Sequence, residues 1–73
     1  MKIEKMRNKL EKVHLKLQKR TREGRLTVDG MSMEEYMSKK GELACERSQK
    51  LQAASGYLAV AIECLFAAEQ IDG

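Results

Sequence analysis

Residues 44–68 read ACERSQKLQAASGYLAVAIECLFAA. Leucine recurs every seven residues in this stretch, at Leu51, Leu58 and Leu65, and an alanine follows each of these leucines three residues later. A seven-residue repeat of this kind is typical of a helix that packs along one face against another helix. Because alanine leaves little bulk between two backbones, the repeat predicts close antiparallel packing and an all-α fold.

A second helical pattern lies near the N-terminus. Apolar side chains there follow a 3-4-3-4 spacing, which places them on one narrow stripe of a helix: Ile3, Met6, Leu10, Val13 and Leu17. Cations at Lys19, Arg20 and Arg22 suit the last turn of such a helix. Gly24 can take the left-handed conformation that follows many helix ends. We therefore predict a first helix over about residues 2–23.

The next helix has a clear start signal. Ser32 is followed three residues later by Glu35, which is the pattern of a capping box and predicts a helix that begins at Met33. No firm stop follows, so we expect this second helix to cover about residues 33–71, after a linker at about 24–31.

A chain of 73 residues forms one small domain, residues 1–73, which buries only about 60% of its unfolded surface. The predicted fold is all-α, an antiparallel helical hairpin with a long second helix that dimerises into a four-helix bundle. A three-helix bundle, broken near Gly41, is the alternative.

The second helix is apolar on most sides between Ala53 and Ala68. A first helix of about 33 Å and a second of about 58 Å would leave everything beyond Gly56 projecting past the first helix by roughly 25 Å. Natural monomers rarely keep such a surface exposed, so we expect another copy or another helical protein to cover it. The expected partner-binding residues are Leu51, Ala54, Tyr57, Leu58, Ala61, Ile62, Leu65 and Phe66.

Six lysines step by three or four residues along one flank of the first helix: Lys2, Lys5, Lys9, Lys12, Lys16 and Lys19. Six like charges in one row repel, so the row is expected either to lie in solvent or to have a counter-charge nearby, for which there are two possible sources. One source is the glutamates of the second helix, namely Glu34, Glu35, Glu42 and Glu46. The other is the phosphate backbone of a nucleic acid. The lysines expected to contact a nucleic acid or another anion are Lys5, Lys9, Lys12, Lys16 and Lys19.

The sequence contains no recognisable motif of a catalytic or metal-binding site. His14 is the only histidine, and no serine, cysteine or acidic residue has the spacing of a catalytic partner. No Gly-rich phosphate loop or metal-spaced cluster occurs, so we expect a non-enzymatic protein without cofactor or metal.

Cysteine usage and charge favour the cytoplasm. Cys45 and Cys64 would lie about 28 Å apart on one helix, too far for a disulfide, and free thiols fit a reducing compartment. The N-terminus is charged where a signal peptide would be apolar. The apolar stretch at 56–68 is shorter than the roughly 20 residues a membrane span needs, so no membrane partner is expected.

In architecture the predicted hairpin resembles two known kinds of small helical hairpin. A basic first helix, a short linker, and a second helix with Tyr36 near its start and an Ala/Ile/Leu-rich end are similar to type III secretion co-chaperones. Proteins of that family hold another helical chaperone and, through it, a needle subunit. The plasmid RNA-modulating hairpins are the second kind, dimeric four-helix bundles that contact paired RNA loops through one helical face.

Three functions follow as expectations. The first is a protein–protein interaction module, such as an adaptor, co-chaperone or inhibitor, that binds through the apolar C-terminal half of the second helix. The second is a hairpin that binds RNA or DNA through the lysine row. The third is an oligomer that sequesters a small anionic ligand between subunits.

Overall fold

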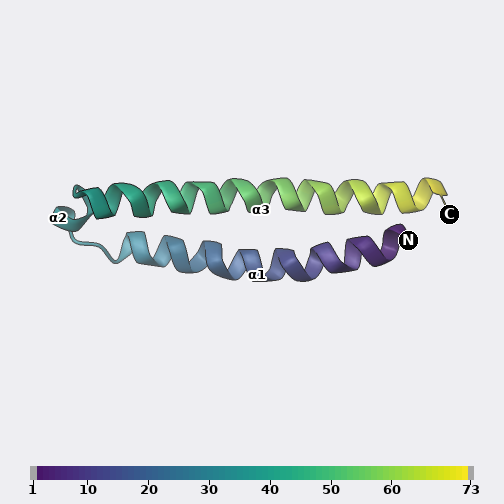
Figure 1. Ribbon diagram of the computed structural model, residues 1–73, viewed down its shortest axis with the longest axis horizontal. Helices are drawn as coiled ribbons and strands as arrows, with labels where there is room; N and C mark the ends of the chain where they lie inside the picture. The colour runs from purple at the N-terminus through teal and green to yellow at the C-terminus, as the bar shows by residue number, and fades with distance from the viewer. Residues whose placement is uncertain (1, 73) are drawn as a thin grey trace.

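The computed structural model describes residues 2–72 and shows an antiparallel helical hairpin (Figure 1). Helix α1 covers Ile3–Asp29, the single-turn helix α2 covers Met33–Tyr36, and helix α3 covers Lys39–Asp72. The two long helices lie side by side in opposite directions, with both chain ends at the same end of the molecule. The all-α hairpin predicted from the sequence is confirmed.

Helix α1 is longer than its sequence pattern predicted. The expected end near residue 23 is wrong, because α1 continues through Gly24 and ends at Asp29. Gly24 does not take a left-handed conformation, and it is buried where the last turns of α1 pack against α3. A Cβ atom built on Gly24 would lie 3.7 Å from Leu51 Cδ1, an ordinary van der Waals distance, so this glycine lies directly against α3. The helix stops at Gly30, whose N–H donates to the Leu26 carbonyl at 3.0 Å.

The second helix begins where predicted and then breaks. Ser32 is the N-cap of α2, and its Oγ accepts a hydrogen bond from the Glu35 N–H at 3.2 Å. The continuous helix expected over 33–71 is wrong, because the chain leaves the helix at Met37 and re-enters it at Lys39. The break is upstream of Gly41, and the single turn of α2 does not make a three-helix bundle.

Two local features explain the break. The Ser38 hydroxyl donates to the Glu35 carbonyl and accepts from the Gly41 N–H at 3.3 Å, so Ser38 ends α2 and caps α3 at once. Gly41 is buried beneath the end of α2. A Cβ atom there would collide with the carbonyl oxygens of Glu35 and Tyr36 and come within 2.6 Å of the Tyr36 carbonyl carbon. Gly41 therefore allows α2 to pack on the first turn of α3.

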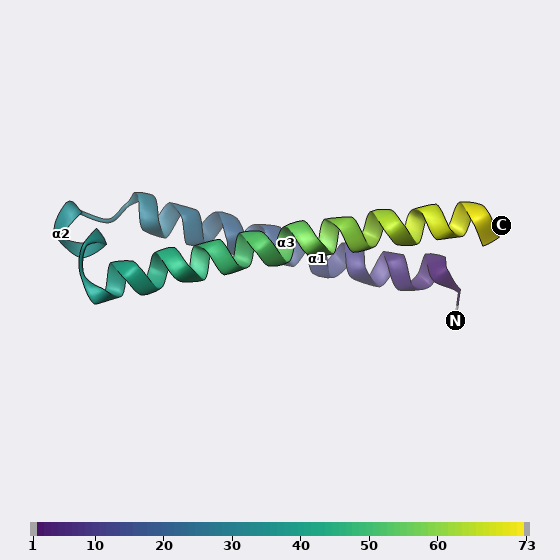
Figure 2. The ribbon, with the colours of Figure 1, turned by 90° about the horizontal axis from the view of Figure 1, so that it is seen from above.

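The expected overhang of the second helix is also wrong. With 27 and 34 residues, α1 and α3 are about 40 Å and 51 Å long, so their lengths differ less than predicted. Arg7, near the start of α1, forms an ion pair with Glu69, near the end of α3, at 2.7 Å. The N-terminal end of α1 therefore lies beside Glu69 instead of Ala53, and α1 accompanies α3 almost to its C-terminal end (Figure 2).

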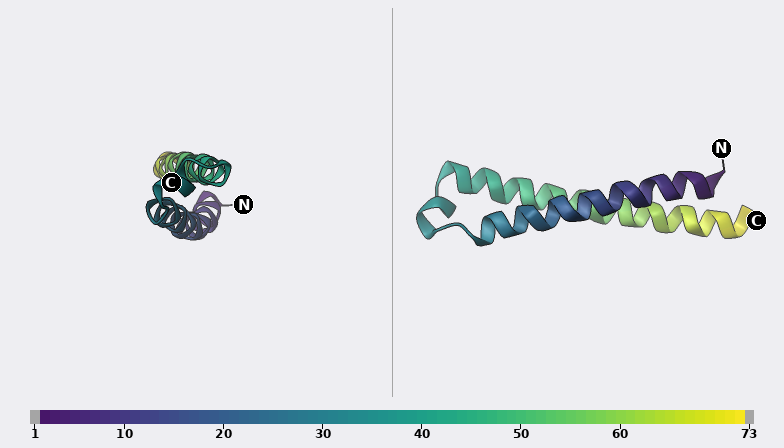
Figure 3. Two further views of the ribbon diagram at one scale, coloured as in Figure 1. Left: turned by 90° about the vertical axis from the view of Figure 1, so that its left-hand side faces the viewer. Right: turned by 90° about the horizontal axis from the view of Figure 1, so that it is seen from below.

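The molecule is a rod of two helices without a third layer (Figure 3). Its Cα extents are 55 × 15 × 14 Å, and its radius of gyration is 16.5 Å. A compact chain of this length has a radius of gyration of about 11 Å. Within residues 2–71 no hydrophobic side chain is buried, and the buried residues are Gly24, Gly41 and Ser48. One helix can cover only one side of another, so α3 keeps the rest of its surface in solvent.

Candidate interaction surfaces

Every third or fourth residue of α1 is turned toward α3. Ile3, Leu10 and Leu17 are half-buried there, as predicted, whereas Met6 and Val13 are 41% and 52% exposed, so their predicted place in the seam is wrong. The other positions of the seam belong to Arg7, His14, Thr21 and Val28. Met6 and Val13 are seven residues apart, and the same step along the helix leads to Arg20 and Thr27, so this face of α1 becomes polar and is exposed. The stripe that α3 covers instead includes Gly24 and Val28.

The seam is held by polar contacts at its open end. Arg7 Nε lies 2.7 Å from Glu69 Oε2, and an Arg7 guanidinium nitrogen lies 2.6 Å from Glu11 Oε1. The same guanidinium lies 5.4 Å from the centre of the Phe66 ring, within cation–π range. Hydrogen bonds to Glu69 and then to Glu11 raise the pKa of Arg7 above its ordinary value. Through these contacts Arg7 ties the first turns of α1 to the last turns of α3.

Hydroxyl groups occupy the middle of the seam. Thr21 Oγ1 donates to the Leu17 carbonyl at 2.8 Å and lies 3.4 Å from the Leu51 carbonyl oxygen. His14 Nε2 lies 3.4 Å from Ser55 Oγ, a contact between distant residues that sequence spacing did not predict. In the part of the chain that the structure describes, no carboxylate hydrogen-bonds to His14, and no three His, Cys, Asp or Glu side chains gather as metal ligands.

The residues predicted to bind a partner fall into two groups. Leu51, Leu58, Ile62 and Leu65 are half-buried at the spacing of the seam, so they pack against α1. Ala61 is half-buried at the edge of the seam. Ala54, Tyr57 and Phe66 are exposed, Tyr57 by 78%. The leucine repeat therefore holds the hairpin together, and the surface free to bind another molecule lies beside it.

A second heptad stripe runs along α3 next to the first. It consists of Ala54, Tyr57, Ala61, Cys64, Ala68 and Ile71, which we call the outer stripe. Ala61 and Ala68 are half-buried and the other four residues are exposed, with Ile71 at 88%. Arg7 contacts both Glu11 and Phe66, so these two residues lie on the same side of the hairpin. The heptad positions of the outer stripe place it on the opposite side, which also carries Met6 and Val13 of α1. This side of the rod is apolar over the C-terminal half of α3.

The lysine row is exposed along the outside of α1. All six of its lysines are exposed, and none is among the ion pairs found within residues 2–72. Glu42 pairs with Lys39 of its own helix at 3.8 Å, and no ion pair joins the row to the glutamates proposed as its counter-charges. The row therefore presents its charge to solvent.

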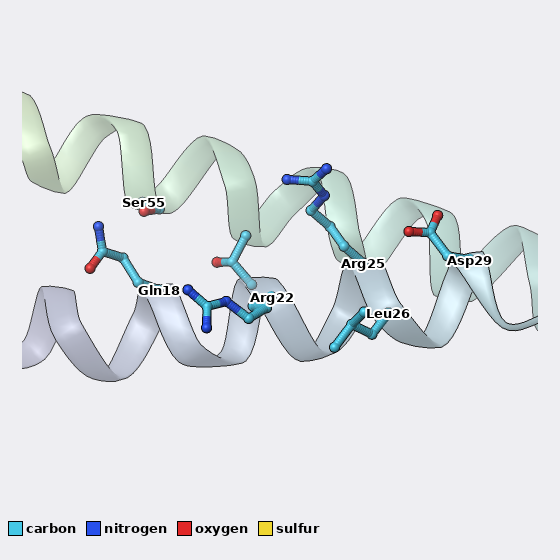
Figure 4. Close-up of a pocket in the computed structure, with 7 residues that line it drawn as sticks. Gln18, Arg22, Arg25, Leu26, Asp29 and Ser55 are labelled. Carbon is cyan, nitrogen blue, oxygen red and sulfur yellow. The ribbon is translucent and has the colours of Figure 1, made fainter.

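A groove of about 480 Å³ lies on the Arg7 side of the hairpin (Figure 4). Gln18 of α1 points toward Ser55 of α3 in this groove, and the two cations beside it, Arg22 and Arg25, are exposed. Asp29 also lines the groove and puts a carboxylate beside the arginines. The groove is open to solvent and has no buried charged side chain, so it does not enclose a small anion.

Helix α3 is also long and apolar enough to cross a membrane by length and composition. Over 18 consecutive residues its mean hydropathy is 1.5, and none of that window is buried in the hairpin. The sequence pattern predicted no membrane span because the apolar stretch at 56–68 alone is too short. A lipid surface is therefore one outcome that the experiments below must distinguish from a protein partner.

The sequence matches no protein-family model, and neither a curated protein nor a solved structure matches it. The resemblance to co-chaperones and RNA-modulating hairpins therefore stays a prediction from the sequence pattern.

Proposed function

We propose that this protein is a small non-enzymatic protein–protein interaction module, of the adaptor, co-chaperone or inhibitor kind, which binds its partner through the apolar side of α3. The observation that carries the proposal is that no hydrophobic side chain within residues 2–71 is buried. A folded protein normally removes its large apolar side chains from water, and a large exposed apolar patch usually marks a binding surface. The apolar side chains of this hairpin therefore need a cover that its own fold does not supply.

The surface available for binding is concentrated on α3. Its exposed large hydrophobic residues include Leu43, Tyr57, Val60, Phe66 and Ile71. Between Leu51 and Ala68 this helix carries one charged residue, Glu63. A rigid helix with few charges and a large aromatic side chain in solvent suits a helical partner, which can pack its own apolar side chains along the same stripe.

The test must use residues that do not hold the hairpin together. Leu58 and Leu65 pack against α1, so changing them would confuse loss of binding with loss of the fold. Tyr57 and Ile71 are almost free of intramolecular cover, and we choose Tyr57→Lys/Ile71→Lys as the binding variant. Leu15→Lys is the matched control, because Leu15 is 67% exposed on α1 and lies away from the outer stripe.

The experiment is affinity capture with the tagged wild-type chain and the two variants, followed by mass spectrometry. We expect proteins captured in stoichiometric amounts by the wild type and by Leu15→Lys to be lost with Tyr57→Lys/Ile71→Lys. Circular dichroism should show equal helicity for all three chains. If the double variant captures the same proteins in the same amounts, the apolar side of α3 is not the binding surface and the proposal is wrong.

A second candidate function is nucleic-acid binding through the lysine row. It is favoured by six exposed lysines over about 26 Å of one rigid helix, none of them in an ion pair within the described chain. Binding to phosphates releases counterions, so the logarithm of the binding constant should fall linearly with the logarithm of salt concentration. The variant is Lys9→Glu/Lys12→Glu/Lys16→Glu, and the control of equal charge is Lys40→Glu/Arg47→Glu/Lys50→Glu on α3. Salt-independent binding, or equal loss with both triple variants, would rule out the row.

A further inference from the structure

We propose that the outer stripe of α3 binds the same stripe of a second copy of this chain, in antiparallel orientation. This inference depends on the proposed function, because it names the molecule that covers the apolar side of α3. It concerns Ala54, Tyr57, Ala61, Cys64, Ala68 and Ile71, which the hairpin leaves wholly or partly exposed.

The outer stripe has the spacing of a helix-packing seam. Its residues are separated by three and four positions in alternation, like the leucine seam beside it, so α3 carries two adjacent heptad stripes. A helix with two such stripes can pack against two neighbours at once. Helix α1 occupies one stripe and reaches only the edge of the other, at Ala61 and Ala68, and within residues 2–72 no further long helix packs on the outer stripe.

The order of large and small side chains makes the outer stripe complementary to itself. Consider two antiparallel copies of α3 in the register that places Tyr57 opposite Ala68 of the second copy. In this register the residue numbers of any two opposed residues add to 125. In the same register Ile71 lies opposite Ala54, and Cys64 lies opposite Ala61. Each large side chain thus meets an alanine, and the two-fold axis repeats every pair. A foreign partner would not require this symmetry, whereas a two-fold dimer does.

The charges at the ends of the stripe fit the same register. Lys50 continues the stripe toward the N-terminus of α3. The register places it just beyond the C-terminal end of the second copy's α3, where the helix dipole favours a cation. Glu63, the one charged residue between Leu51 and Ala68, is on the opposite side of the helix and stays in solvent.

The exposed area of the chain is sufficient for a stable dimer. One chain exposes 5984 Å², whereas a compact monomer of 8.3 kDa exposes about 4,600 Å². The excess of roughly 1,400 Å² exceeds the 800 Å² or so that each partner buries in an interface of standard size. Pairing through the outer stripe also brings Met6 and Val13 of α1 toward the second copy, which gives a four-helix arrangement with those two side chains near its centre.

The first experiment measures mass in solution by analytical ultracentrifugation. We expect the wild type to sediment at twice the 8.3 kDa of one chain. Ala68→Tyr opposes Tyr57 of the second copy with a second tyrosine and should give monomers. The exchange Tyr57→Ala/Ala68→Tyr restores one large and one small residue at each pair and should restore the dimer. Ala59→Tyr is the control, because Ala59 is exposed on the other side of α3.

The second experiment reads the register directly, and it needs no disruptive variant. In a Cys45→Ser background, Ala61→Cys lies opposite the native Cys64 of the second copy, so mild oxidation should give a covalent dimer. Cys64 alone in this background should cross-link far less, because the two Cys64 residues are offset by three positions, about 4.5 Å along the axis. Ala59→Cys in place of Ala61→Cys should not improve on Cys64 alone.

The outcomes separate this inference from the proposed function. If the wild type remains at 8.3 kDa up to millimolar concentration, the proposal that a second copy covers the outer stripe is wrong. If that monomer still captures proteins in a manner that depends on Tyr57 and Ile71, the interaction module stands and its partner is foreign. If it instead co-sediments with phosphatidylserine–phosphatidylcholine vesicles, and does so only with Tyr57 and Ile71 intact, the stripe binds lipid and both proposals are wrong. A dimer that Ala68→Tyr leaves intact overturns the register.

Discussion

Gly41 is the glycine on which the turn between α2 and α3 depends. A methyl group at this position would meet the backbone carbonyls of Glu35 and Tyr36, which cannot move without unwinding α2. We expect Gly41→Ala to lower the free energy of unfolding by about 1–2 kcal/mol, because the steric clash exceeds the gain in helix propensity. Urea denaturation followed by circular dichroism would measure it. A variant as stable as the wild type would show that α2 does not pack on Gly41 in solution.

Gly24 and Gly56 should respond in the opposite way. A Cβ atom at Gly56 would meet nothing within 4 Å, and at Gly24 its nearest neighbour would be Leu51 Cδ1 at 3.7 Å, an ordinary contact. Alanine is favoured over glycine inside a helix by about 1 kcal/mol. Gly56→Ala should therefore raise the free energy of unfolding by about that amount, and Gly24→Ala should not lower it. Destabilisation by Gly24→Ala would mean that the helices approach each other more closely than described.

The pairing of Arg7 with Glu69 fixes how far α1 extends along α3. Arg7→Glu would oppose Glu69 and Glu11 with a like charge, so the melting temperature should fall. Glu69→Arg should do the same, since it would oppose Arg7. The double exchange Arg7→Glu/Glu69→Arg restores attraction between the two helices and should recover much of the loss. Thermal unfolding of the four chains gives the coupling. Additive losses without recovery would contradict the observed register.

At the scale of elements, Ser38 decides where α3 begins. Its hydroxyl accepts from the Gly41 N–H and donates to the Glu35 carbonyl, so it serves both helices. Ser38→Ala removes both contacts and should cost about 1 kcal/mol of stability, typical of a lost N-cap. Ser38→Asp keeps the acceptor for Gly41 and should lose less. Equal stability of all three chains in urea would show that the break has another cause.

The sequence was sufficient for the type and direction of the elements. The leucine repeat predicted the antiparallel hairpin, and the capping box at Ser32 predicted the start of α2. Ser38 preceding Lys39, Lys40 and Gly41 was a possible N-cap signal, but the stronger start at Ser32 concealed it. The end of α1 could not be read because Gly24 suits both a helix end and a close helix contact, and only the packing of Leu51 distinguishes them.

The candidate surfaces were predicted less well, for a related reason. Helix α1 ends six residues later than predicted, and the long helix α3 begins six residues later than predicted. The two helices therefore overlap further along α3, and the leucines assigned to a partner face α1. The polar contacts of the seam could not be predicted, because their residues belong to no apolar pattern. Arg7 pairs with Glu69 and His14 contacts Ser55 only once the two helices pack together. Tyr57 and the lysine row both lie away from the seam and are exposed, and their predicted roles in binding stay predictions.

As a whole molecule, the hairpin leaves more of its surface exposed than a compact domain of its mass would. Its two helices share a narrow seam that includes an ion pair, two hydroxyl groups and a histidine, and within residues 2–71 it buries no hydrophobic side chain. The area-proportional hydrophobic term that usually dominates folding is therefore small for one chain. Covering a second face of α3 would supply it, which couples stability to association.

This coupling predicts that stability depends on protein concentration. When two chains unfold together, each tenfold increase in concentration should add about 1.4 kcal/mol to the free energy of unfolding per dimer, because mass action favours the associated state. Urea midpoints measured across a hundredfold range of concentration should therefore rise steadily for the wild type and for Leu15→Lys. They should lie lower for Tyr57→Lys/Ile71→Lys, with little dependence on concentration. A wild-type midpoint that is high and constant across the range would show that the polar seam alone folds the chain.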